Sequence, residues 1–297
     1  MLAYSEFKEI IREQAEKETG CRVVINPVKK LNGLILDGLV IISTDSNVSP
    51  TIYLNGYYEK YKECMDVEED PVSVVWKELY KTYKQHLPRF DFDESDFTDF
   101  EKVRGRLRVK LVNYYSNQEL LDDLACIQYL DLAITFYVSV ELEKKEMASI
   151  AVKKQHMEYW GKTEDELLEI AKENMEDEYE YMTMDQMLKE LVSKEIEFEM
   201  QDGSPLYVLG NRNRMYGASS VLIDGLLDRI AEECGADDLA IIPCSIHETI
   251  LFPLTEETDL SVINNMIEEV NRTEVSKEEY LSNHVYTYNV KEKKIRY

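Results

Sequence analysis

Cysteine is scarce in this chain, and its few cysteines are not arranged as metal ligands or as a disulfide framework. Five cysteines occur in 297 residues, the count is odd, and no two form a C-x-x-C pair. Structural zinc sites need clustered ligands, and disulfide scaffolds need a dense, even set. We therefore expect the scattered cysteines to be small, buried apolar residues: Cys21, Cys64, Cys126, Cys234 and Cys244.

Histidine and the common catalytic motifs are also lacking. The four histidines (His86, His156, His247 and His284) lie far apart, which disfavours a three-histidine zinc site. The sequence has no G-x-G-x-x-G, G-x-x-x-x-G-K-[ST], H-E-x-x-H or G-x-S-x-G motif. We therefore expect no metal and no cofactor.

Long apolar runs are absent as well. No run approaches the roughly 20 residues that span a bilayer. The first residues, MLAYSEFKEIIREQ, mix charges into an apolar pattern and lack the apolar core of a signal peptide. These features predict a cytoplasmic protein with no membrane association.

Positive charge is in deficit. The chain has 34 Lys and Arg against 59 Asp and Glu, a net charge of −25, while 44% hydrophobic residues indicate a folded protein. Such a surface repels nucleic acid and anionic lipid. The charge favours a protein partner with a basic surface and predicts no direct binding to nucleic acid. The oligomeric state is not predicted.

The densest acidic stretch is FDFDESDFTDFE, residues 90–101, and three interpretations compete for it. As a calcium loop starting at Asp91 it fails, because position 6 is Asp96 and position 12 is Lys102. As a short helix it would be capped by Ser95 or Asp96, with Phe97, Phe100 and Val103 on one face. As a surface that mimics nucleic-acid phosphates it would present Asp91, Asp93, Glu94, Asp96 and Asp99.

The order of the remaining patterns predicts an α+β fold of mixed, largely antiparallel sheets with flanking amphipathic helices. DLAITFYVSVE (131–141) is apolar and β-branched, as in a central strand, and MASIAV follows as a hairpin partner. Capping boxes are predicted at Thr163/Glu166, Thr183/Gln186 and Ser276/Glu279. A weak boundary near residues 105–120 divides the chain into 1–112 and 113–297, unless both form one unit.

The segment with the most chemistry is PCSIHET, residues 243–249, between the predicted strands DLAIIP and TILFPL. A thiol, a hydroxyl, an imidazole and a carboxylate occupy five consecutive positions. Ser245, or Cys244, is a candidate nucleophile, His247 its base and Glu248 the orienting acid. The alternative is a polar turn that satisfies backbone groups.

A basic turn offers a second candidate. GNRNR (210–214) places Arg212 and Arg214 on a turn of an otherwise acidic chain. Such guanidinium groups are suited to receive a carboxylate or a phosphate, and the alternative is a solvated turn.

The segments VKLVNYYSNQELLDDL, IIPCSIHETILFP and EEVNRTEVSKEEYLS occur in an order that resembles an uncharacterised domain-of-unknown-function family of gut anaerobic, Clostridia-type bacteria. The resemblance covers nearly the whole chain and is most specific in I-P-x-S-x-H-E and V-N-x-T-x-V. It implies a soluble bacterial α+β protein without an assigned activity, and it supplies no catalytic residues. Cys244 stands where that family tends to have Ser, which argues against a required hydroxyl at this position.

Two functions follow as hypotheses. The first is a non-catalytic binding or regulatory protein with an acidic, aromatic surface, in one version an inhibitor that occupies a partner's basic nucleic-acid-binding channel. The second is a hydrolase that uses Ser245, His247 and Glu248.

Overall fold

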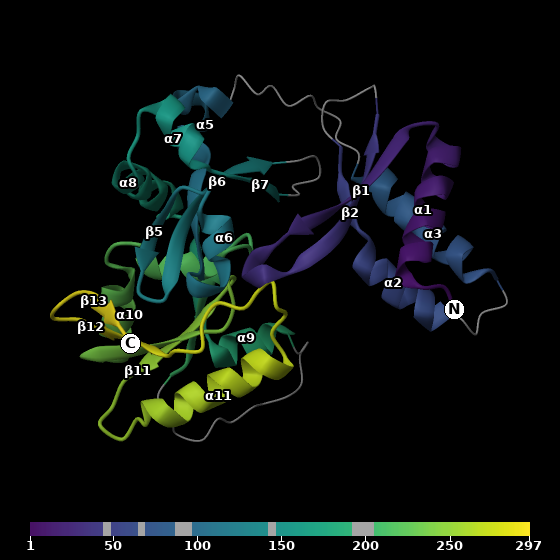
Figure 1. Ribbon diagram of the computed structural model, residues 1–297. Coiled ribbons are helices and arrows are strands. Elements are labelled where there is room, and N and C mark those ends of the chain that lie inside the picture. The colour runs from purple at the N-terminus through teal and green to yellow at the C-terminus, as the bar shows by residue number, and fades with distance from the viewer. Residues whose placement is uncertain (44–48, 65–68, 87–96, 142–146, 192–204) are drawn as a thin grey trace. The chain divides into compact units, whose positions relative to one another are not determined.

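The computed structural model describes residues 1–43, 49–64, 69–86, 97–141, 147–191 and 205–297 (Figure 1). The chain forms two compact units, Met1–Glu94 and Ser95–Tyr297. This division falls earlier than the expected boundary near residues 105–120. The reason is strand pairing: the strand from Leu107 to Asn113 pairs with the strand from Leu132 to Glu141 and so belongs to the second unit.

Unit 1 combines an antiparallel three-stranded sheet with three helices. In chain order its elements are α1 (Tyr4–Thr19), β1 (Arg22–Lys29), β2 (Ile35–Ile42), β3 (Thr51–Tyr53), α2 (Leu54–Glu63) and α3 (Pro71–Gln85). Helix α1 ends at Gly20, whose φ of 67° is the left-handed conformation that glycine adopts without strain. Helix α3 begins at a typical helix start signal, with Asp70 accepting a hydrogen bond from the Ser73 backbone and Pro71 in the first turn.

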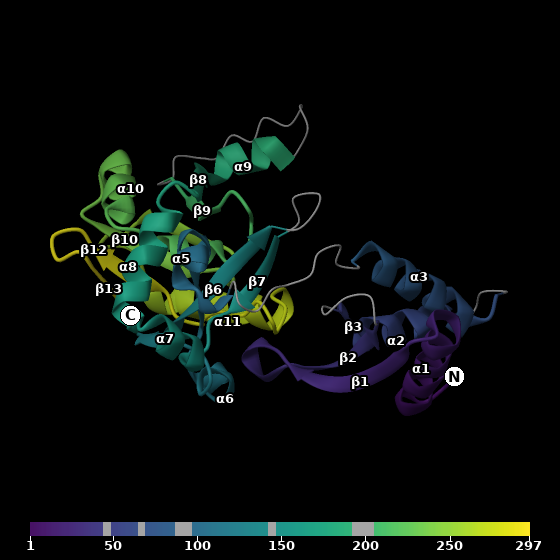
Figure 2. The same cartoon turned by 90° about the horizontal axis from the view of Figure 1, so that it is seen from above.

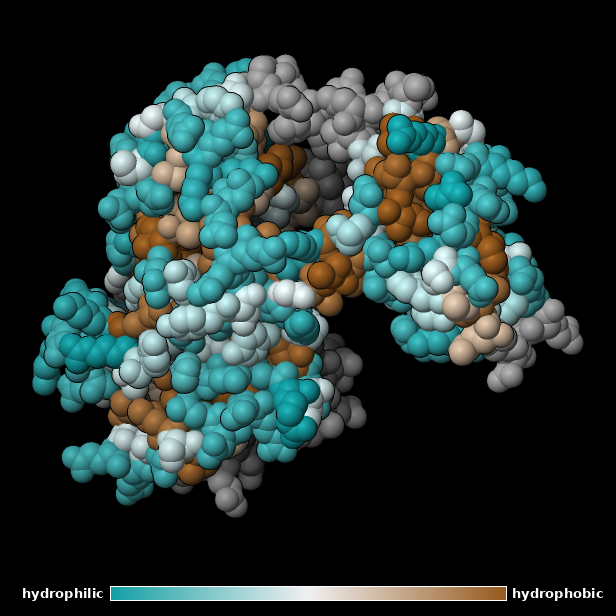
Figure 3. Space-filling view, viewed as in Figure 1, coloured by the Kyte–Doolittle hydropathy of each residue, from teal (hydrophilic) through white to brown (hydrophobic). Residues whose placement is uncertain are grey.

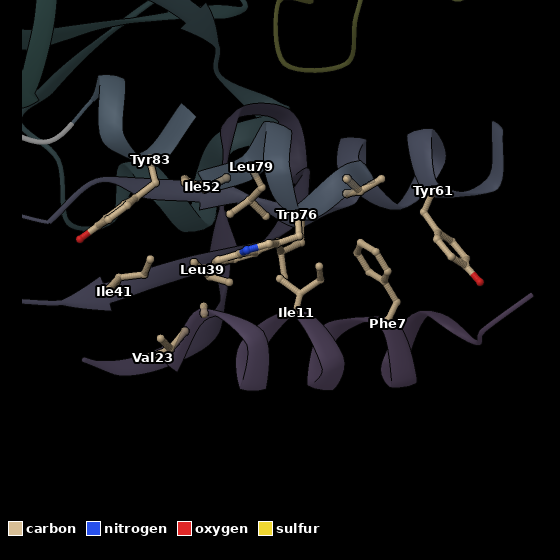
Figure 4. Packing of buried hydrophobic residues seen from close by; sticks show 13 residues of the cluster. Phe7, Ile11, Val23, Leu39, Ile41, Ile52, Tyr61, Trp76, Leu79 and Tyr83 are labelled. Carbon is tan, nitrogen blue, oxygen red and sulfur yellow. The ribbon is translucent and has the colours of Figure 1, made fainter. Parts of the chain in front are cut away.

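The core of unit 1 lies between its helices and its sheet. Figure 4 shows Ile11 of α1, Leu39 of β2 and Trp76 of α3 pointing toward one another, and each is at most 4% exposed. Because these side chains come from three elements that are far apart in sequence, their burial fixes the helices against the sheet.

Unit 2 contains two antiparallel sheets. In the four-stranded sheet β6 (Leu132–Glu141) is central, as predicted, and pairs with β4 (Leu107–Asn113), β5 (Cys126–Tyr129) and β7 (Met147–Ala151). The six-stranded sheet runs in the order β13-β12-β10-β11-β9-β8. Its strands are β8 (Tyr179–Thr183), β9 (Tyr207–Asn211), β10 (Asp238–Pro243), β11 (Thr249–Pro253), β12 (Tyr286–Asn289) and β13 (Lys294–Arg296).

Helices pack on both faces of the six-stranded sheet (Figure 2). Alternate residues of β10 point to opposite faces. Helix α11 (Leu260–Thr273) buries Ile267 against the face that carries Ala240 and Ile242. Helix α10 (Leu226–Cys234) is tied to the sheet by Asp228, which accepts a hydrogen bond from the hydroxyl of Tyr288 at 2.6 Å.

The remaining helices of unit 2 are short or amphipathic. They are α5 (Phe100–Val103), α6 (Gln118–Leu121), α7 (Lys154–Trp160), α8 (Glu164–Met175) and α9 (Met184–Leu191), with 3₁₀ turns at Arg104–Arg106, Tyr115–Asn117 and Gly217–Leu222. The predicted capping boxes at Thr163/Glu166 and Thr183/Gln186 are both present. Phe97, Phe100 and Val103 are buried together as predicted, and Trp160 packs on both phenylalanines.

Several local sequence patterns do not match the structure. The segment ASSVL (218–222) suggests a strand that would pair with β9, but these residues lie in the 3₁₀ turn, and β9 pairs instead with β8 and β11. The acidic connection around Tyr179 is strand β8. Ser276 and Glu279 form a turn and not a helix start, with the backbone N–H of Glu279 donating to the Ser276 carbonyl. Val270 follows Ile263 and Ile267 at helical spacing, which suggests a core position, but it is 49% exposed on α11.

Every strand pair among the described residues is antiparallel, and helices flank the sheets, so the chain is an α+β protein as predicted. Within the same residues, none of the helices has both the length and the apolar character that crossing a bilayer requires.

Leu209 offers a test of the core of unit 2, because this β9 residue is fully buried. Replacing it with alanine removes buried methyl groups and leaves a cavity. We expect L209A to lower the free energy of unfolding by about 2–5 kcal/mol. The chain has two tryptophans, Trp76 in unit 1 and Trp160 in unit 2, so urea unfolding followed by fluorescence in a W76F background reports on unit 2.

The control is V262A, which truncates a side chain that is 52% exposed on α11. It should change the free energy of unfolding by no more than about 0.5 kcal/mol. A loss of less than about 1 kcal/mol for L209A would contradict the packing described for this sheet.

Candidate functional site

The loop of residues 244–248 joins β10 to β11 at the end of the hairpin in which Pro243 pairs with Thr249. The loop is closed by a hydrogen bond from the Ser245 backbone N–H to the Glu248 carbonyl, 3.2 Å. Ile246 is 3% exposed, and its N–H donates to the carbonyl of Glu279 at 2.9 Å. The loop is therefore anchored by a segment that follows it by about thirty residues.

The 3₁₀ turn at Gly217–Leu222 passes directly against this loop. A Cβ atom on Gly217 would lie 2.6 Å from the His247 carbonyl oxygen and 2.6 Å from the Asn211 backbone nitrogen. Neither atom belongs to a side chain that can turn away. The contact accounts for glycine at this position, since only a residue without a Cβ permits so close an approach.

His247 is held by its neighbours in space and not by Ser245. Its Nδ1 accepts a hydrogen bond from the Tyr216 backbone N–H at 3.1 Å, and its ring stacks on the Tyr216 ring with centroids 5.8 Å apart. Because Nδ1 is an acceptor, the neutral ring carries its proton on Nε2. Nε2 lies 3.7 Å from Oε1 of Glu279, and among the described residues no ion pair joins the imidazole to the predicted Glu248.

Residues of the four-stranded sheet hold Tyr216 in turn. The ammonium group of Lys110 lies 4.5 Å from the Tyr216 ring centroid, and the Tyr137 ring meets it edge-on at 5.2 Å. Tyr216 also has a φ of 60°, a strained value for a bulky residue. Strain of this kind persists where the surroundings impose it, and here the surroundings place a ring beneath His247.

Ser245 does not form a relay with His247. Its Oγ accepts a hydrogen bond from the His247 backbone N–H at 3.0 Å. In the described part of the chain no hydrogen bond joins Ser245 to the imidazole, whereas an activated serine needs its base within reach. The hydrolase hypothesis stays a prediction, and this geometry does not favour it.

Cys244 is not arranged as a nucleophile either. Burial, with a smaller contribution from the Glu248 carboxylate, raises the pKa of the Cys244 thiol to about 12. Its Sγ lies 3.7 Å from the Ile242 carbonyl. Since the thiolate is the nucleophilic form, burial disfavours the reactive form of this cysteine at neutral pH.

A pocket of about 500 Å³ lies beside the loop and brings Ser245, His247 and Glu248 together. It forms on the face of the six-stranded sheet on which α11 packs, where Met182, Val208 and Ile250 are cross-strand neighbours. Glu180 and Met182 come from β8, Val208 and Gly210 from β9, and Met187 from α9. The volume is in the range of small-ligand and side-chain binding sites.

The pocket is acidic but contains one guanidinium group. Glu180, Glu248 and Glu279 line it together with Arg214. Among the described residues, neither Glu180 nor Glu248 pairs with a cation. Arg214, with a φ of 51°, thus joins the predicted serine, histidine and glutamate in one pocket. Arg212 does not line it, and its backbone N–H donates to the Glu178 carbonyl.

Of the five predicted acidic binding residues, only Asp99 lies within the described part of the chain. Asp91, Asp93, Glu94 and Asp96 lie outside the described residues. Asp99 is the N-cap of α5, and its carboxylate accepts a hydrogen bond from the Glu101 backbone. Within the described ranges, no group of three His, Cys, Asp or Glu side chains is placed to hold a metal ion.

Gly217 tests how the loop is supported. We expect G217A to displace the His247 loop, because the added Cβ meets backbone atoms at 2.6 Å, and to cost about 1–3 kcal/mol of stability. The readouts are urea unfolding and the imidazole NMR signals of His247. The control is G105A, where no atom lies within 4 Å of the new Cβ, and unchanged His247 signals in G217A would refute the close approach.

Alkaline pH provides a second test. Tyr181 also has its pKa raised to about 12, by burial and by its hydrogen bond to Glu233. As pH rises above the ordinary Cys and Tyr values near 9 and 10, the unfolded chain loses protons that the folded chain retains. The stabilisation that these two groups contribute is therefore fully present below about pH 9 and is lost as the pH rises toward 12.

Urea unfolding measured at intervals between about pH 8 and pH 11 checks this expectation. Removing the thiol in C244A should make the decline shallower. A free energy of unfolding that stays constant or increases over this range would show that these groups are not protected in the folded chain.

Comparison with known proteins gives a family and no activity. No curated protein and no solved structure matches the chain. Residues 4–290 match DUF5688, a family of unknown function, which agrees with the family type expected from the sequence segments. With nearly its whole length matched, the chain belongs to the DUF5688 family.

Proposed function

We propose that this protein is a non-catalytic binding protein that receives a lysine or arginine side chain of a basic protein partner in the pocket beside the 244–248 loop. The observation that carries the proposal is the arrangement of the pocket lining. Three glutamates from separate segments meet there, and Met182, Met187 and Val208 supply an apolar wall.

This combination of groups suits a long cationic side chain. Lys and Arg pack their aliphatic stems along apolar surface and keep the charged end in a polar setting. Methionines adapt their shape to a range of partners. Glu180 and Glu248 are exposed and unpaired within the described residues, so their charges are available to a partner's cation.

The net charge of the chain also supports a basic partner. The net charge of −25 raises the rate of encounter with a basic surface, and hydrophilic residues cover most of the face shown in Figure 3. The finer version of the proposal is that the partner's basic surface is a nucleic-acid-binding channel. It rests on net charge alone, because most of the acids of residues 90–101 lie outside the described residues.

The test compares two triple variants that remove the same amount of charge. Binding of a fluorescent lysine- and arginine-rich peptide is measured by anisotropy at low salt and at about 150 mM salt. We expect E180Q/E248Q/E279Q to weaken binding about tenfold, since each exposed ion pair contributes up to about 1 kcal/mol.

The matched control is E256Q/E257Q/E274Q, which neutralises three exposed glutamates outside the pocket. It should weaken binding less than twofold. Equal losses in both triple variants would mean that the peptide follows net charge and not the pocket, which would overturn the proposal.

A further inference from the structure

A second cavity, of about 470 Å³, lies in unit 2 and shares no lining residue with the pocket of the 244–248 loop. Every residue that lines it carries a polar group, and these groups are amides, hydroxyls, two carboxylates and one imidazole. Among the described residues no lysine or arginine lines it. Nothing in the cavity is therefore suited to bind a phosphate or another anion by charge.

The most deeply placed group of the lining is the carboxylate of Asp131. Asp131 is 4% exposed and belongs to the tight turn between β5 and β6. One of its oxygens accepts a hydrogen bond from Ser282 Oγ and the other from the Tyr286 hydroxyl, both at 2.7 Å. Each carboxylate oxygen can accept a second hydrogen bond, so Asp131 retains acceptor capacity for a ligand hydroxyl.

Asparagine amides line the cavity with donors whose orientation is already set. The side-chain carbonyl of Asn264 accepts a hydrogen bond from the Val285 backbone, and that of Asn283 accepts one from Asn271. Their NH₂ groups have no partner among the described residues. Asn265, exposed on α11, adds both a donor and an acceptor.

Two exposed tyrosines complete the lining. Tyr115 is 62% exposed and Tyr297 is 60% exposed, and the Tyr297 ring stacks on His284 at 5.0 Å. An exposed ring beside an array of amides and a carboxylate offers a flat apolar surface next to paired donors and acceptors. A pyranose ring has the complementary form, because its hydroxyls are donors and acceptors at the edge and its C–H groups form an apolar face.

We propose that this cavity binds a neutral saccharide. In the described part of the chain the lining contains no lysine or arginine, which argues against phosphorylated or acidic sugars. An organic cation fits less well, because apart from the carboxylates of Asp131 and Glu268 the lining consists of amides, hydroxyls and one imidazole. The inference is independent of the proposal for the other pocket.

The test is titration of the full chain with maltotriose, cellotriose, xylotriose, mannotriose and chitotriose, followed by saturation-transfer NMR and calorimetry. At least one trisaccharide should bind with a Kd below about 1 mM. Y297A and N265A should each weaken that binding about fivefold or more. Both residues are exposed, so these variants are expected to fold normally.

The matched control is Y159A, which removes a tyrosine that is 58% exposed on α7 and does not line the cavity. It should leave saccharide binding unchanged. The proposal is overturned if no trisaccharide binds at about 10 mM, if Y297A behaves like Y159A, or if tetramethylammonium displaces the bound saccharide.

Discussion

A buried carboxylate connects the two sheets of unit 2. Asp131 extends from the four-stranded sheet and accepts hydrogen bonds from Ser282 and Tyr286, which lead into β12 of the six-stranded sheet. Asn113, at the end of β4, donates to the Leu281 carbonyl at 3.0 Å. An unpaired buried polar group costs about 1–3 kcal/mol, so these contacts hold the segment 281–286 in place.

Glu279 and Tyr280 directly precede this segment. Glu279 lines the acidic pocket, and Tyr280 lines the polar cavity. Both candidate sites therefore depend on the same junction.

The 244–248 loop shows why adjacent chemical groups in a sequence do not form a catalytic unit by themselves. The backbone of the loop uses the Ser245 hydroxyl to satisfy the His247 N–H, so that hydroxyl is a structural acceptor. The imidazole takes its contacts from Tyr216 and Glu279, 31 residues before it and 32 residues after it. Tyr216 is held by Lys110 of the other sheet. What the loop presents to the pocket is thus decided by three distant segments, and the result is a lining of fixed polar groups.

Local patterns in the sequence predicted those elements whose stabilising contacts are local. The capping boxes at Thr163 and Thr183 and the central strand 132–141 needed only neighbouring residues or a continuous apolar run. The same S-x-x-E spacing at Ser276 failed, because the Glu279 carbonyl accepts a hydrogen bond from Ile246 and the chain then continues toward Asp131. The segment ASSVL (218–222) suggests a strand, yet it lies in a 3₁₀ turn whose first residue, Gly217, closely approaches the 244–248 loop. Long-range contacts of this kind leave no periodic signal.

The distribution of acidic residues shows that local sequence patterns also fail to reveal which residues form a candidate site. A run of acids such as residues 90–101 is conspicuous in the sequence, but like charges in a run repel one another and remain hydrated. Glu180, Glu248 and Glu279 attract no notice individually, and the fold brings them to one pocket with Arg214. Arg214 lines the same pocket, so its guanidinium offsets part of the repulsion among the three carboxylates.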